Sequence, residues 1–148
     1  MSNSIDLTQR PPRSPRVRLG GFVILPRTLD KGRADLAGKI GEYHFNCPLD
    51  QRFLEFVQID AEALKEQLAA GKGDGEILKW IMENSKTKPS PVAIEAWASF
   101  VERRVPADLE TRKFFDEMQA ACGPERDDIA TWFDLLDLDD HVTFGGKA

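Results

Sequence analysis

Capping residues, prolines and glycines divide most of this sequence into short segments of helical periodicity. Within each segment apolar residues recur three and four positions apart, which gives a helix one apolar face. Ser90 followed by Pro91 is a typical helix start, because serine caps the first turn and proline fits the first helical position. No long stretch alternates apolar and polar residues as a half-buried strand does, so the predicted fold class is all-α.

We expect a compact bundle of about seven short helices joined by short loops. With caps and stop residues included, they run from Leu25 to Gly38, Pro48 to Val57, Asp60 to Gly71, Asp74 to Ser85, Ser90 to Arg104, Asp108 to Gly123 and Asp127 to Leu136. The stretch from Gly41 to Cys47 has no helical period and is predicted to be an ordered loop.

The start of the chain differs in composition from the rest. Three prolines and four arginines occur between Arg10 and Gly21, and proline both removes a backbone donor and prevents a regular helix. We predict that residues 1–21 form an extended Pro/Arg-rich N-terminal arm packed on a single helical domain of residues 22–148. Charge favours this packing, because residues 1–20 carry a net charge of +3 and residues 125–140 a net charge of −6.

The whole chain of 148 residues is acidic, with a net charge of −5. Phosphates repel such a surface, so no nucleic acid is expected as a partner. No run of about 18 apolar residues is present, and the first residues lack the apolar core of a signal peptide, which predicts a soluble cytoplasmic protein with no membrane partner. The two cysteines, Cys47 and Cys122, are expected to be reduced thiols.

The polar face of the first predicted helix, with the loop and helix after it, is the main candidate site. Pairs of arginines can hold a carboxylate or a phosphate through parallel hydrogen bonds. The predicted ligand-binding residues are Arg27, Asp30, Lys31, Arg33, His44, Asn46 and Arg52, with Asp30 and Asp50 holding the arginines in place. The alternative is that these charges pair with one another and lock the loop onto the helices.

His44 gives the same region a second interpretation. Its imidazole can exchange a proton near neutral pH, with Asp50 orienting the ring. Cys47, just before a predicted helix, could serve as a nucleophile, although a free cysteine is more often buried and inert. If the protein is an enzyme, His44, Cys47 and Asp50 are its candidate catalytic residues.

A metal site is not predicted. The segment from Asp134 to His141 is rich in carboxylates, but it lacks the glycine and the terminal glutamate of a calcium-binding loop. Two histidines and two cysteines could form a closed zinc site only if distant parts of the chain met. We expect neither a metal nor a cofactor, and an acidic helix end exposed to solvent.

Several separated segments resemble one protein family. They are Ser14-Pro-Arg16, Leu19-Gly-Gly-Phe-Val-Ile-Leu-Pro-Arg27, Leu29-Asp-Lys31-Gly-Arg33-Ala34, Glu42-Tyr-His-Phe-Asn46, Leu49-Asp50 and Arg52-Phe-Leu-Glu-Phe56. Together they look like the domain of unknown function 5069. The resemblance implies a small bacterial helical protein and implies no activity. We therefore expect a non-catalytic binding module for a small anionic ligand or a protein partner, the alternative being a small enzyme that uses His44 as general acid and base.

Overall fold

Helix α1 (Leu25–Leu36) lies at the centre of the fold, because other elements cover it on nearly all sides. Nine of its twelve residues are buried, including the charged residues Arg27, Asp30 and Lys31. Only its last turn, with Arg33, Asp35 and Leu36, reaches solvent. Its charges must therefore find partners inside the protein.

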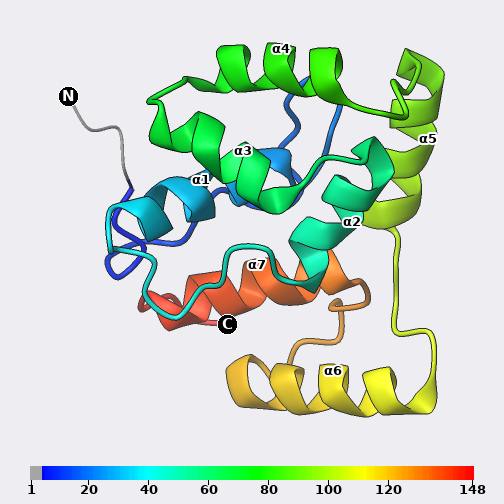
Figure 1. The fold of residues 1–148 in the computed structure, drawn as a ribbon. Helices are drawn as coiled ribbons and strands as arrows, with labels where there is room; N and C mark the ends of the chain where they lie inside the picture. The colour runs from blue at the N-terminus through cyan, green and yellow to red at the C-terminus, as the bar shows by residue number, and fades with distance from the viewer. Residues whose placement is uncertain (1–4) are drawn as a thin grey trace.

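The computed structural model describes residues 5–148, where it has seven α-helices and no strand beyond an isolated bridge between Leu19 and Phe22. The other six helices are α2 (Pro48–Val57), α3 (Ala61–Ala69), α4 (Asp74–Asn84), α5 (Pro91–Glu102), α6 (Leu109–Cys122) and α7 (Trp132–Thr143). In Figure 1, α3 and α4 lie on one side of α1 and α7 on the other, with α6 outermost beyond α7. The all-α prediction is confirmed.

An aromatic cluster joins α2 to α5. The rings of Phe56 and Trp97 are stacked with centroids 4.7 Å apart, and Phe22 packs edge-on against Phe53 at 5.2 Å. Phe22 and Phe53 are fully buried in the hydrophobic core that α1 shares with its neighbours. Aromatic pairs of this kind add to the stabilisation that comes from burying their area.

Local capping explains where the middle helices begin. Asp60 accepts a hydrogen bond from the Ala63 backbone N–H at 3.0 Å, and Ser90 accepts one from the Ala93 N–H at 3.1 Å, as the sequence predicted. At α4 the prediction was wrong by one residue. Gly73 is the N-cap, and the Glu76 carboxylate accepts from the Gly73 backbone N–H.

The predicted last helix was also displaced. It was expected at 127–136, but α7 covers Trp132–Thr143. Thr131 begins it through a capping box, in which Asp134 N–H donates to Thr131 Oγ1 at 3.1 Å and Thr131 N–H donates to Asp134 Oδ2 at 3.0 Å. The acidic end is not wholly exposed either, because Asp140 is buried.

No helix occurs between residues 5 and 24, where backbone hydrogen bonds tie the chain to the body. Leu7 N–H donates to Lys39 C=O, and Ile24 N–H donates to Pro15 C=O, both at 2.9 Å. Leu7 is 1% exposed. Residues 1–4 of the predicted arm lie outside the described residues, and the division at residue 21 stays a prediction.

Close packing of α1 on α3 gives a first test. A Cβ added at Gly32 would lie 2.5 Å from Leu68 Cδ1 and 3.1 Å from a Phe45 ring carbon, whereas nothing lies within 4 Å of one added at Gly75. Gly75→Ala should raise the free energy of unfolding by up to about 1 kcal/mol through helix propensity. Gly32→Ala should lower it by about 1 kcal/mol, because overpacking outweighs that gain. Urea unfolding of both variants measures this, and equal stabilisation would contradict the packing described.

Candidate functional site

Four charged side chains of α1 each contact a carboxylate or arginine from a different part of the chain. Their partners come from the segment before α1, from the first turns of α2 and α4, and from α7. The pairs are Arg27 with Asp140, Asp30 with Arg13, Lys31 with Asp50 and Arg33 with Asp74. In residues 5–148 no buried side-chain nitrogen or oxygen lacks a hydrogen-bond partner.

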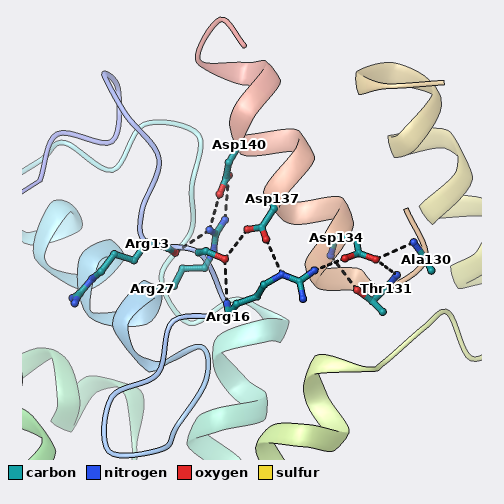
Figure 2. A network of polar contacts seen from close by, with 9 residues as sticks. Arg13, Arg16, Arg27, Ala130, Thr131, Asp134, Asp137 and Asp140 are labelled. Carbon is teal, nitrogen blue, oxygen red and sulfur yellow. Dashed lines mark hydrogen bonds and ion pairs between the residues drawn. The ribbon is translucent and has the colours of Figure 1, made fainter. Parts of the chain in front are cut away.

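Arg27 and Asp140 form the pair that fixes α7 to α1 (Figure 2). Arg27 Nη1 donates to Asp140 Oδ2 at 2.8 Å and Nη2 donates to Oδ1 at 3.3 Å, a bidentate arrangement. Tyr43 Oη donates to the same Oδ1 at 2.6 Å, and its ring lies 5.5 Å from the guanidinium carbon of Arg27. Burial, and then this hydrogen bond, raise the pKa of Tyr43, so the phenol remains a donor.

Lys31 and Asp50 form the pair that fixes α2. Lys31 Nζ lies 2.9 Å from Asp50 Oδ2, and the two side chains are 3% and 0% exposed. Thr28 Oγ1 donates to Asp50 Oδ1 at 2.6 Å, and the Asn46 backbone N–H donates to Oδ2 at 2.9 Å. Lys31 Nζ also donates to Cys47 Sγ at 3.1 Å.

Arg13 links the segment before α1 to both α1 and α4. Its backbone N–H and its Nε donate to Asp30 Oδ2 at 2.9 and 3.1 Å, and Nη1 donates to Asp74 Oδ2 at 2.8 Å. Arg33 Nη1 donates to the other oxygen of Asp74 at 2.7 Å. Burial acts to raise the pKa of Asp74, but the hydrogen bonds from Arg13 and Arg33 outweigh it and hold that pKa below its usual value.

A pocket lies where the segment before α1 meets α7. Its volume is about 240 Å³, and it is lined by Arg16, Arg126, Asp128, Ile129, Asp134, Asp137, Leu138 and His141. Arg16 pairs with Asp134 and donates from Nε to Asp137 at 2.9 Å, as Figure 2 shows. Arg126 pairs with Asp128 at 2.6 Å. Both arginines therefore have carboxylates as neighbours already.

The predicted ligand-binding residues divide into two groups. Internal ion pairs use Arg27, Asp30, Lys31 and Arg33. His44 and Asn46 are exposed and Arg52 is half-buried, and none of the three forms an ion pair in residues 5–148. The bonds to Asp50 come from Lys31, Thr28 and the backbone before α2, and none comes from His44.

Arg104, which the sequence reading missed, lies near Arg52. Phe56 of α2 stacks on Trp97 of α5, and the two helices run in opposite directions in Figure 1. Arg52 lies one turn before Phe56 in α2, and Arg104 lies two residues beyond the last residue of α5. Because the two helices are antiparallel, both arginines belong to the same end of this contact. Burial and repulsion from Arg52 lower the pKa of Arg104. The Arg104 carbonyl accepts from Trp132 N–H at 3.1 Å, which holds it at the start of α7.

Neither arginine has a carboxylate within ion-pair distance in the part of the chain that the structure describes. Within residues 5–148, no three His, Cys, Asp or Glu side chains form a group that could hold a metal ion. No helix in that range is long and apolar enough to span a membrane.

The fold and its buried charges define a class: an all-helical domain built around one central polar helix. The sequence model described as Domain of unknown function (DUF5069) matches residues 9–142, and the chain belongs to this family. The resemblance seen in the sequence is thereby confirmed over nearly the whole chain. Among curated proteins, none matches the sequence significantly.

Removing one member of a buried pair gives a second test. Arg27→Met leaves the Asp140 carboxylate, which is 8% exposed, without its cation and should lower the free energy of unfolding by about 3 to 5 kcal/mol. Arg112→Met is the control, because its pair with Asp116 is exposed and should cost at most about 1 kcal/mol. Chemical denaturation at neutral pH measures both values. Similar small losses in the two variants would show that the Arg27 pair does not hold α7.

The lowered pKa of Asp74 gives a third test. An acid with a lowered folded-state pKa stabilises the protein above its unfolded pKa, about 3.9, and that stabilisation disappears as pH falls through the folded value. Asp74→Asn should therefore lower the free energy of unfolding by about 1 to 2 kcal/mol at pH 7. The loss should become smaller as the pH falls below about 4. Stability curves from pH 7 to pH 2.5 measure the difference. A difference that stays constant down to pH 2.5 would contradict the assignment.

Proposed function

We propose that the protein is a non-catalytic binding module for a small anion, a phosphate or a carboxylate, held between Arg52 and Arg104. Two half-buried guanidinium groups that repel each other are stabilised by an anion between them. Arginine also suits this role through its planar, bidentate hydrogen bonding. The observation that carries the proposal is the absence of any carboxylate partner for either arginine in residues 5–148.

The other residues predicted from the sequence have different parts in this proposal. Arg27, Asp30, Lys31 and Arg33 hold α1 against its neighbours, since each is already paired. His44 and Asn46 are kept as candidate contacts for a ligand that extends beyond the guanidinium groups. Both are exposed on the loop that leads into α2, the helix that carries Arg52.

Catalysis is not proposed, because Asp50 is fully buried and already bonded to Lys31 and Thr28. A protein partner is the second candidate. Phe100, Leu109 and Phe114 are 62%, 89% and 55% exposed at the end of α5 and along α6, and apolar side chains of this size favour contact with another surface. A cytoplasmic location and the bacterial source implied by the family stay predictions.

Phosphate binding tests the anion proposal directly. Inorganic phosphate should raise the melting temperature of the protein in a background of constant ionic strength, because a ligand of the folded state alone stabilises it. Arg52→Ala and Arg104→Ala should each weaken phosphate affinity about tenfold or more, which corresponds to about 1.4 kcal/mol. Calorimetric titration with phosphate, and then with citrate, measures the affinities.

Arg103→Ala is the matched control. Arg103 adjoins Arg104 but is exposed, and its Nε donates to Ser99 C=O at 3.1 Å. Its replacement should leave phosphate affinity within about twofold, since exposed charges are screened by salt. If Arg103→Ala weakens binding as much as the other two changes, phosphate is responding to net charge and the proposed site is wrong. If no anion binds the unaltered protein, the second candidate is favoured.

A further inference from the structure

Cys47 and Lys31 make a contact that the anion proposal does not use. Lys31 Nζ lies 3.1 Å from Cys47 Sγ and 2.9 Å from Asp50 Oδ2, so the amine stands between a thiol and a carboxylate. Cys47 is half-buried at the end of the loop before α2, whereas Lys31 is 3% exposed. Part of Cys47 is therefore open to solvent, while the Lys31 amine is held against its sulfur.

We propose that peroxide oxidation joins Cys47 to Lys31 through a sulfenamide bond. Hydrogen peroxide first converts the thiol to a sulfenic acid, with one water released as the peroxide is reduced. The Lys31 ammonium transfers a proton to Asp50, and the amine nitrogen attacks the sulfur. The S–N bond forms as the S–O bond breaks, and the hydroxide leaves as a second water with a proton from nitrogen. Overall, one peroxide removes two electrons from sulfur.

Proximity favours this capture over further oxidation. A sulfenic acid with no nucleophile beside it proceeds to sulfinic acid in excess peroxide. At Cys47 the amine is already in contact with the sulfur, so the trapping step is intramolecular and needs no diffusion. Asp50 assists this step. A protonated amine is not a nucleophile, and the Asp50 carboxylate can accept the extra proton of the Lys31 ammonium group.

Cys122 provides a comparison within the same chain. It is half-buried like Cys47, but its sulfur contacts the Met118 carbonyl at 3.2 Å, and no amine contacts it in residues 5–148. The same peroxide treatment should therefore take Cys122 to the sulfinic acid. The two cysteines therefore differ in the group that contacts the sulfur, which is an amine at Cys47 and a backbone carbonyl at Cys122.

Peptide mapping of the full chain after peroxide treatment tests the proposal. Trypsin should no longer cut after Lys31, so residues 28–33 and 40–52 should appear joined, about 2 Da lighter than the two peptides together. Dithiothreitol should separate them, because thiols reduce sulfenyl bonds. Cys47 recovered as sulfinic acid, about 32 Da heavier and not joined to residues 28–33, would overturn the proposal.

Lys31→Arg is the matched variant, because a guanidinium keeps the charge opposite Asp50 but is a weak nucleophile. It should lose the joined peptides and yield sulfinic acid at Cys47 as at Cys122. Cys122→Ser should still form them. Joined peptides that persist in Lys31→Arg would show that another nitrogen reacts. The mapping of the unaltered protein decides the proposal even if Lys31→Arg does not fold.

Discussion

The fold depends on the pairing of the buried charges of α1 with partners from four other segments. Removing a charge from water costs several kcal/mol, and a buried partner compensates only in good geometry. α1 therefore holds its neighbours in one arrangement. Lys31 pairs with Asp50 at the start of α2, and Arg27 pairs with Asp140 of α7. Such pairs add little stability over apolar packing, but a displaced helix would leave a charge without a partner.

The same principle separates the arginines with structural roles from those that we propose as ligand contacts. Arg13, Arg27 and Arg33 all form ion pairs with carboxylates, and Arg13 pairs with both Asp30 and Asp74. In residues 5–148, Arg52 and Arg104 form no such pair, although both are half-buried and burial, followed by repulsion from Arg52, lowers the pKa of Arg104. The cost of holding two like charges together is what makes this end of α2 and α5 a candidate for anion binding.

Local signals were enough to predict the first six helices closely, since caps such as Asp60 and Ser90 act within one turn. The partners of the charges could not be predicted. Arg27 and Asp140 are 113 residues apart, and no local sequence pattern around either residue indicates its partner. The start of α7 was missed although its signal is local, the capping box of Thr131 and Asp134. Its carboxylates looked like a repelling, exposed end, and the arginines that neutralise them, Arg16 and Arg27, come from the start of the chain.

The central claim is that the cations of α1 are held in internal pairs. Nitrogen-detected NMR of the side chains tests it most directly, because a guanidinium or ammonium group that is buried and hydrogen-bonded exchanges its protons slowly. The account predicts resolved, slowly exchanging Nη protons for Arg27 and an observable ammonium signal for Lys31 at neutral pH, with averaged, fast-exchanging signals for the exposed Arg103. Fast exchange at Arg27 and Lys31, equal to that at Arg103, would contradict it.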